Sequence, residues 1–507
     1  MRFTSLVIEL IRARPRLVVW IVVLTQAALW LIVTVPFYHS PPAGLALALA
    51  YGREYQVGTE LGPPLAFWLA DIAYRAAGNH VFGVYLLAEL CSVAAFWILF
   101  MLGRTLVGSQ HAVLAVLLTM TVTAFGSHTL EFGPAVLALP LWALLLLHSW
   151  ELIGRRPRSV WFAWSIEAGL LLLTTSAAPM LLLLIAGFAL ATSEIRPTRR
   201  SLDPLFALLV VVVLALPYLI WLMRAGTPGL HWPALADFPA RALLWAWLVA
   251  GLVFAMAGIL ILVVLNSGPF THKEEDTPII YRPPVDPLAR QFVYFFAIAP
   301  ALAGSLLAGL FGLDRVVGGT GVALMMSGLA VVVATGDIIH LRRQRLLRLV
   351  WAAIIVAPVL GVAANTLFLP WTEADEVATS LPAREIAQFF TDSFERRTNR
   401  KLAAVAGDTE IASLIALGPG RPHLFNDAAP QRTPWMTLAR FNESGGVVVW
   451  RASDTAGTPP PEIAKRFPNL APEVPRSFDR LVNGRQPMLR IGWAIVRPKG
   501  SGVDFTN

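Results

Sequence analysis

The chain has 507 residues, of which 56% are hydrophobic and 14% charged, and its formal net charge is +8. Soluble domains carry about 25% charged residues, so this composition excludes an ordinary soluble protein and favours one embedded in a lipid bilayer. The basic residues lie mostly in short loops between apolar runs, a pattern typical of lipid anchoring rather than nucleic-acid binding. The only cysteine, Cys91, excludes a disulfide within the chain and a cysteine-based metal site.

Eleven apolar runs are predicted to be transmembrane helices, each of which needs roughly 20 mostly apolar residues. The fifth and sixth runs are short, and a turn is expected between them at Thr174–Pro179. No small-residue cleavage site follows the first run, so it is interpreted as a retained helix rather than a signal peptide. The predicted spans are residues 17–37, 80–103, 110–127, 133–151, 160–176, 178–193, 204–223, 241–266, 290–311, 316–335 and 349–370.

The basic residues of the connecting loops predict the orientation of these spans. With the N-terminus in the cytoplasm, 18 arginines and lysines fall on the inner side, and five arginines fall in the short outer loops. Cytoplasmic loops are enriched in basic residues, so this asymmetry supports that orientation. The protein is therefore expected in the inner (plasma) membrane, with the C-terminal residues 372–507 outside the cytoplasm.

The first outer loop, residues 38–80, is the longest connection within the membrane domain of residues 1–371. Its stretches Ala43–Ala50 and Ala66–Ala77 are expected to be helices lying in the membrane interface, because they are apolar but short, and the second carries aromatic residues and interleaved charge. Between and within them lie the candidate bases Glu54 and Glu60 and the candidate substrate-binding residues Arg53 and Trp68. The alternative is that these charges are merely solvated.

A second group of candidates lies in other outer loops. Glu131 is predicted to be catalytic, because an acidic residue at the membrane surface usually faces a bundle interior or a wet cavity. His128 is near enough in sequence to pair with Glu131 or to be an ordinary interfacial residue. Arg224 and Arg315 are either phosphate ligands or interfacial anchors.

The C-terminal residues 372–507 are predicted to form a small extracytoplasmic α/β domain. A helix is expected at Ala383–Arg397 and another at Asp408–Leu417, and the Pro-rich segment Thr458–Pro475 is expected to be a loop. Strand-like runs are the segments Leu402–Ala406, Gly446–Trp450 and Leu489–Val496.

Several segments resemble glycosyltransferase family 39, the membrane glycosyltransferases of the C fold that include protein mannosyltransferases and lipid A aminoarabinose transferases. Gly62–Leu69 (Gly-Pro-Pro-Leu-Ala-Phe-Trp-Leu) is similar to the family's Pro-Pro-Leu-x-x-Trp-Leu segment, and Thr129–Glu131 to the acid before its fourth helix. Gly169–Ile185 resembles a family helix pair, and Arg490–Ile495 resembles the outer domain of bacterial members. The resemblance covers nearly the whole chain.

The resemblance implies a polyprenyl-phosphate-linked sugar donor and a lipid, glycan or protein acceptor on the outer face. It also implies single displacement, in which a carboxylate takes the acceptor's proton and basic residues hold the phosphate. Two residues usual in the family are absent: Ser40–Ala46 contains no acid, and Gly62 stands where His or Lys commonly precedes the two prolines.

Two other classes of function remain open. A non-catalytic relative that binds a lipid-linked sugar or a partner protein would fit the missing first-loop acid. A transporter is disfavoured because the chain has no internal repeat. No Walker A, GxGxxG, HExxH or GxSxG motif is present, so no cofactor, metal or nucleic acid is expected.

Overall fold

The computed structural model of the protein describes residues 3–126, 130–154, 158–192, 202–225, 237–267, 279–341, 343–372, 378–426, 433–468, 470–480, 484–485 and 488–499. The chain divides into two compact units. The helical unit comprises residues 1–32, 84–220 and 227–360. The tail unit comprises residues 33–83, 221–226 and 361–507, so the first outer loop belongs to the same unit as the C-terminal residues.

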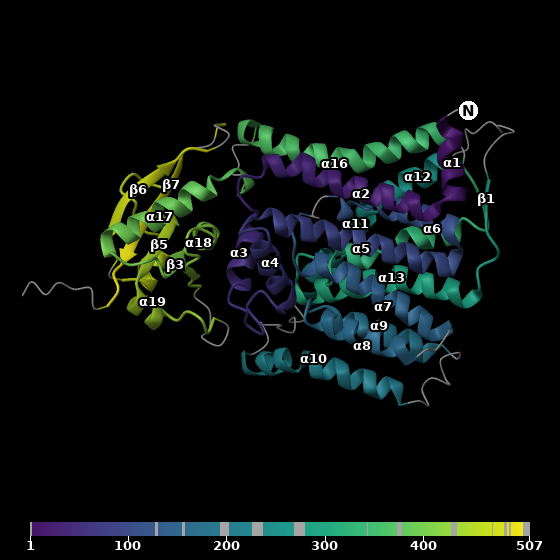
Figure 1. Ribbon diagram of the computed structural model, residues 1–507, viewed down its shortest axis with the longest axis horizontal. Coiled ribbons are helices and arrows are strands. Elements are labelled where there is room, and N and C mark those ends of the chain that lie inside the picture. Colours follow the sequence, from purple (N-terminus) through teal and green to yellow (C-terminus); the bar gives the residue numbers. More distant parts are fainter. Residues whose placement is uncertain are drawn as a thin grey trace, which may run out of the picture. The chain divides into compact units, whose positions relative to one another are not determined.

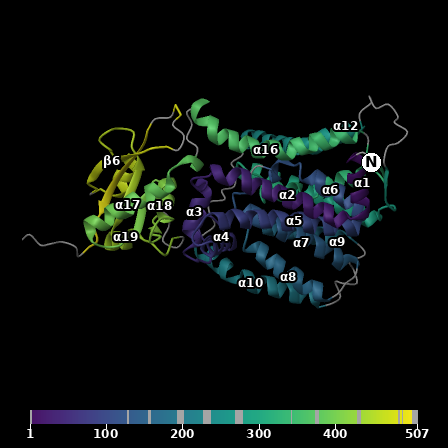
Figure 2. The same cartoon turned by 45° about the horizontal axis from the view of Figure 1, so that its top comes forward.

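The helical unit consists of apolar helices that lie roughly side by side (Figures 1 and 2). Its only strands among the described residues form a two-stranded antiparallel ribbon of β1 (Ile279–Tyr281) and β2 (Ile338–His340). Its helices, four of which (α2, α5, α10 and α16) share residues with the tail unit, are α1 (Phe3–Ala13), α2 (Pro15–Thr34), α5 (Phe82–Val107), α6 (Ser109–Thr119), α7 (Pro134–Gly154), α8 (Arg158–Leu172), α9 (Ala178–Ala191), α10 (Asp203–Ala225), α11 (Phe238–Ala255), α12 (Ala257–Ser267), α13 (Pro287–Phe311), α14 (Thr320–Leu324), α15 (Ser327–Ala334) and α16 (Gln344–Thr372).

Each predicted span corresponds to one helix or to a pair of helices. The span predicted at 241–266 is divided into α11 and α12 at Met256, and the span at 316–335 is divided into α14 and α15. The turn predicted near Thr174 is confirmed, because residues 173–177 separate α8 from α9. Among the described residues, seven helices are long and apolar enough to cross a membrane, and five shorter apolar helices accompany them.

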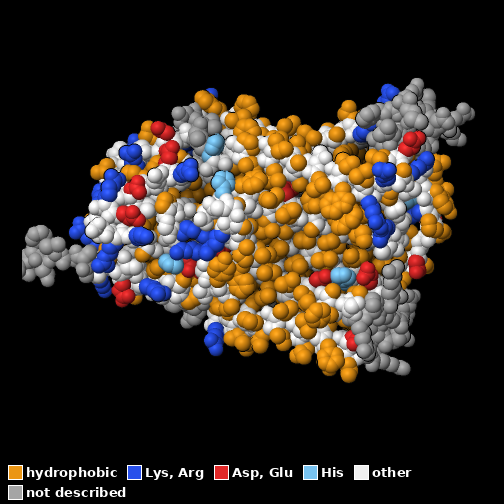
Figure 3. Space-filling view, viewed as in Figure 1, with side chains coloured by type: hydrophobic (Ala, Val, Ile, Leu, Met, Phe, Trp, Pro, Cys, Tyr) orange, Lys and Arg blue, Asp and Glu red, His pale blue; other side chains and the backbone are white. Residues whose placement is uncertain are grey.

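The surface and the packing of the helical unit both suit a bilayer. Helix α10 exposes much of its apolar surface, including Leu205, Phe206 and Val213, all more than half exposed. Hydrophobic side chains cover most of the face of the helical unit that Figure 3 shows, and charged side chains gather at the end where α1 and β1 lie. Small residues permit close helix packing: a Cβ on Gly328 of α15 would lie 2.3 Å from the Ala115 carbonyl oxygen of α6. The predicted polytopic helical fold is confirmed.

The tail unit contains a five-stranded sheet with the order β4-β3-β5-β7-β6. Strands β4, β3 and β5 are parallel, and β7 is antiparallel to both β5 and β6. The predicted α/β architecture is therefore present. The elements are α3 (Ala43–Gly52), α4 (Leu65–Ala76), α17 (Ala383–Thr398), β3 (Ala404–Gly407), α18 (Thr409–Ala416), β4 (His423–Leu424), α19 (Leu438–Ser444), β5 (Gly446–Arg451), α20 (Pro461–Arg466), β6 (Pro472–Phe478) and β7 (Leu489–Val496).

Two features of the tail unit differ from the sequence-based expectations. Residues 458–475 were expected to be loop, but they include helix α20 and the start of strand β6. Helix α20 begins at Pro461, and proline is tolerated in the first turn of a helix because the backbone N–H that it lacks would have no partner there. Strand β6 lies at the edge of the sheet, where prolines are also tolerated. Helix α3, expected in the membrane interface, contributes Ala46, Ala50 and Tyr51 to the hydrophobic core of the tail unit. A helix that is apolar all round is normally buried, and α3 fits that rule.

Candidate active site

The connection between α3 and α4 carries three of the candidate residues. It begins where the two helices approach closely: a Cβ on Gly52 would lie 2.2 Å from the Phe67 carbonyl oxygen of α4, so only glycine fits there. Thr59 and Gly62 then exchange two backbone hydrogen bonds, of 3.2 and 3.0 Å, which close a tight turn. Gly62 has a φ of +116°, a conformation that glycine adopts readily and that His or Lys would not. This backbone geometry accounts for glycine at that position.

Asp71, on α4, is fully buried and is surrounded by positive charge and a phenol. Its Oδ2 accepts from the Arg75 Nε at 2.6 Å and from the Tyr55 hydroxyl at 2.9 Å. Its Oδ1 accepts from the Arg421 Nη2 at 2.6 Å. Tyr55 and Arg421 both have a φ of +47°, which is uncommon for large side chains and is a form of strain concentrated at functional sites. Asp71 thus joins the first outer loop to the turn that follows α18.

Glu54 forms a second link to the same turn. Its Oε1 lies 2.7 Å from the Nδ1 of His423, the first residue of β4. The Glu54 side chain is 7% exposed, and the His423 side chain is 37% exposed. An ionised carboxylate can only accept, so Nδ1 of His423 is the donor in this contact, and Nε2 is an acceptor in the neutral imidazole. Glu54 Oε2 takes part in none of the hydrogen bonds between described residues and is free for a reacting group.

Arg53 lies next to this pair and retains an unused donor. The residue is half-buried, and its Nη1 is buried without a hydrogen-bond partner among the described residues. Burial lowers the pKa of the Arg53 guanidinium, nearby Arg421 and Arg75 lower it further, and Glu54 and Asp71 oppose them. An arginine remains protonated through such a shift. A buried donor left without a partner is costly, so Nη1 is an expected contact point for an anionic ligand.

The other first-loop candidates have different surroundings. Glu60 is exposed and lies within the turn between Thr59 and Gly62. Trp68 is half-buried, and its Nε1 donates to the Gln56 carbonyl oxygen at 3.1 Å, which holds the loop against α4. Of the three candidates between α3 and α4, therefore, Arg53 and Glu54 are enclosed and Glu60 is solvated.

The remaining candidates belong to other segments of the chain. Glu131 and Arg315 belong to the helical unit, and both are exposed. Arg224, in the last turn of α10, is also exposed. His128 lies outside the described residues. No group of three metal-ligating side chains is found within the described ranges.

Two residues of the cluster carry no signal in the sequence. His423 and Arg421 lie 369 and 350 residues from their partners Glu54 and Asp71. A single sequence contains nothing that connects positions so far apart. Asp71 did carry a signal, since it is an acid within an apolar helix with Arg75 four residues later, the spacing of a helical ion pair.

Comparisons with known proteins agree with the fold and the motifs. The family model for dolichyl-phosphate-mannose-protein mannosyltransferases matches residues 62–221, a range that begins at the Gly-Pro-Pro segment and includes Glu131. The crystal structure of ArnT from Cupriavidus metallidurans in the apo state is similar, with a TM-score of 0.54 and 14% identity over 94% of this chain and 98% of that chain. At that identity the likeness concerns the fold.

A second solved structure is more distant. Archaeal oligosaccharyltransferase AglB from Archaeoglobus fulgidus, solved with an inhibitory peptide and a dolichol-phosphate, aligns with 79% of this chain and 64% of its own. Its TM-score of 0.34 and identity of 13% carry no argument here. No curated protein matches the chain in sequence. The resemblance to the C-fold glycosyltransferases is confirmed by the family model and by the ArnT-like fold.

Proposed function

We propose that this protein, an integral membrane protein with the fold of the C-type glycosyltransferases, transfers a sugar from a polyprenyl-phosphate donor to a lipid, glycan or protein acceptor on the outer face of the membrane. The observation that supports it best is Arg53, which offers a buried, unpartnered Nη1 beside the Glu54–His423 pair. A lipid-phosphate donor needs a cation at the membrane surface, and transfer to a hydroxyl needs a base.

Arg53 is the proposed ligand of the donor's phosphate. Its neighbours Arg75 and Arg421 already hold Asp71, whereas Arg53 Nη1 holds nothing among the described residues. Arginine binds phosphate through two parallel hydrogen bonds, which a lysine ammonium cannot provide. Arg224 and Arg315, both exposed, better suit interfacial anchoring.

Glu54 is the proposed base, and His423 is the residue that holds it. In a single displacement the acceptor's oxygen bonds to the anomeric carbon as the bond from that carbon to the phosphate oxygen breaks. The phosphate leaves with the electron pair, and the acceptor's proton passes to Glu54 Oε2. The bond from His423 Nδ1 fixes the other oxygen and keeps the carboxylate in one orientation. Glu131 remains a predicted catalytic residue.

A non-catalytic function is the second candidate. It is favoured by one specific observation, the absence of an acid in Ser40–Ala46, where the family usually has one. In such a protein Arg53 would still bind a lipid-linked phosphate, but the Glu54–His423 pair would be a structural link only. Measuring donor binding and sugar transfer separately distinguishes the two functions.

Replacing Arg53 by lysine should raise the KM for the lipid-linked donor by about 10- to 150-fold, because one charge-assisted hydrogen bond of about 1.5–3 kcal/mol is lost. The same replacement at Arg224 or Arg315 keeps the charge on an exposed side chain and should leave the KM unchanged. The measurement is donor dependence in membranes, with radiolabelled sugar as the reporter. Equal KM values for all three variants would contradict the role of Arg53.

The proposed orientation of the chain can be tested by fusion. Alkaline phosphatase joined after Thr372 should be active in a bacterial host, because it matures only outside the cytoplasm. Fusion after Ser267, before the predicted inner loop that contains Lys273, should be inactive despite equal expression. A stable but inactive fusion at Thr372 would contradict an outward-facing tail and every outer-face site proposed here.

A further inference from the structure

A cavity lies entirely within the helical unit, and none of the residues of the Arg53 cluster lines it. Its volume is about 400 Å³, within the range of small-molecule sites. Leu114, Leu117 and Leu118 of α6 line it, together with apolar residues of α1, α2, α12 and α15. Trp351 of α16 closes one wall, and its Nε1 is fixed by a 2.9 Å hydrogen bond to the Leu117 carbonyl oxygen. The cavity is therefore built from packed helices rather than from a loose surface.

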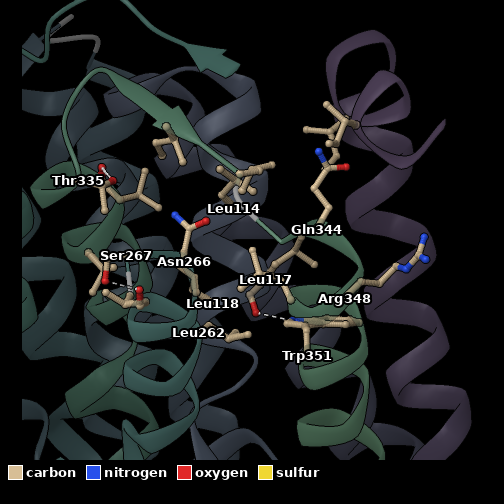
Figure 4. A pocket seen from close by; sticks show the side chains of 18 of the residues that line it. Leu114, Leu117, Leu118, Leu262, Asn266, Ser267, Thr335, Gln344, Arg348 and Trp351 are labelled. Atoms are coloured by element: carbon tan, nitrogen blue, oxygen red, sulfur yellow. Dashed lines mark hydrogen bonds between the residues drawn. The ribbon is translucent and has the colours of Figure 1, made fainter. Parts of the chain in front are cut away.

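The polar groups of the lining are few and are unevenly placed. Figure 4 shows Gln344 and Arg348 of α16 on one side, Asn266 and Ser267 at the end of α12 on the other, and leucines between them. Gln344, Leu347, Arg348 and Trp351 are spaced as one face of a helix, so the same face of α16 supplies both the cation and the apolar wall. The apolar volume suits the acyl chain of a lipid, and the cation at its border suits the lipid's headgroup.

The basic residues around the cavity favour a lipid with an anionic headgroup. Arg348 lies in the lining, and Arg343 precedes Gln344 in the sequence. Arg12 of α1 donates to the Ile279 carbonyl oxygen, and Ile279 pairs with His340, between the lining residues Ile339 and Leu341. Figure 3 shows Lys and Arg gathered at this end of the helical unit. Basic segments beside a membrane attract anionic headgroups.

We propose that this cavity is a binding site for an anionic phospholipid. One acyl chain fills the apolar volume between α6, α12 and α16, and Arg348 contacts the headgroup phosphate with Gln344 beside it. The occupant is not the sugar donor, because the distribution of basic residues predicts the Arg343–Arg348 segment on the inner side, whereas the proposed function has the donor's phosphate on the outer side.

Native mass spectrometry of the delipidated full-length protein tests the site. Phosphatidylglycerol and phosphatidylcholine with identical acyl chains are added in turn, so that only the headgroup charge differs. The wild type should retain phosphatidylglycerol preferentially, and Arg348→Gln should reduce that retention about fivefold. Arg345→Gln is the matched control, because Arg345 is an exposed arginine on the same helix that does not line the cavity.

The apolar half of the site is tested by filling it. Leu118→Phe and Val263→Phe add volume at half-buried lining positions and should lower retention of both lipids. Thermal unfolding identifies any variant that fails to fold, and the arginine comparison stands without these variants. Equal retention of the two lipids by the wild type, or equal losses for Arg348→Gln and Arg345→Gln, would overturn the proposal.

Discussion

Replacing Glu54 by glutamine should lower the rate of sugar transfer by about 10²-fold or more, the usual scale for losing a general base. Glutamine keeps the shape of the side chain, and its amide oxygen still accepts from His423 Nδ1, so the tail unit should remain folded. The measurement is transfer at saturating donor, where chemistry limits the rate. Glu60→Gln is the matched control: it alters an exposed carboxylate six residues away and should leave the rate within a few-fold of the wild type.

His423→Asn separates the two members of the pair. The asparagine amide can still donate a hydrogen bond to Glu54 but cannot accept a proton at the position of Nε2. If Glu54 is the base, His423→Asn should retain most of the activity, whereas loss as large as in Glu54→Gln would assign the base to His423, oriented by Glu54. Glu131→Gln belongs in the same series, and wild-type rates there would remove Glu131 from the mechanism.

A wild-type rate in Glu54→Gln, with chemistry limiting, would contradict the proposed base. If Arg53→Lys still weakened donor binding in that case, the non-catalytic function would be favoured.

Replacing Asp71 by asparagine should destabilise the tail unit by about 3–5 kcal/mol, the usual cost of removing one partner from a buried ion pair. Asp71 is fully buried, and both of its oxygens contact arginines, so its loss leaves two guanidinium groups without a counter-charge. The free energy of unfolding is measured by denaturant titration in detergent, with proteolysis of the tail unit as the reporter. Asp392→Asn, which alters an exposed aspartate on α17, should change it by no more than about 0.5 kcal/mol.

An Asp71→Asn variant as stable as Asp392→Asn would show that the arginines are satisfied by water. A loss of activity without a loss of stability would instead make Asp71 a positioning residue for Arg53 and Glu54.

Local sequence patterns predicted much of this fold because the relevant forces act over short distances. The apolar runs correspond to helices since the bilayer requires about 20 apolar residues per crossing, and β7 was predicted with the ends it has, Leu489 and Val496. The edge strand β6 was missed because its two prolines are typical of loops. Helix α3 was assigned to the membrane interface, since an apolar helix carries no information about which apolar surface covers it.

The candidate site could be predicted only in part, because local sequence patterns do not show contacts between distant residues. Arg53 and Glu54 were identified as charges in an outer loop, because such charges need an explanation near a bilayer. What distinguishes them from Glu60 is burial and pairing, which depend on a turn formed by Arg421 and His423. Ion pairs between residues hundreds of positions apart have no periodicity or spacing that a single sequence could reveal.

The separation of Glu54 and His423 along the chain also means that they are synthesised at different times. At about 5–20 residues per second, the 369 residues between them take roughly 20–70 seconds to be made. During that interval α3 exists without the hydrophobic core that later buries Ala46, Ala50 and Tyr51. The nascent chain must therefore hold an apolar helix at the membrane surface until the last quarter of the chain has been synthesised. A lesion far downstream, such as one that delays folding of β3 or β5, would prolong the exposure of a segment made near the start.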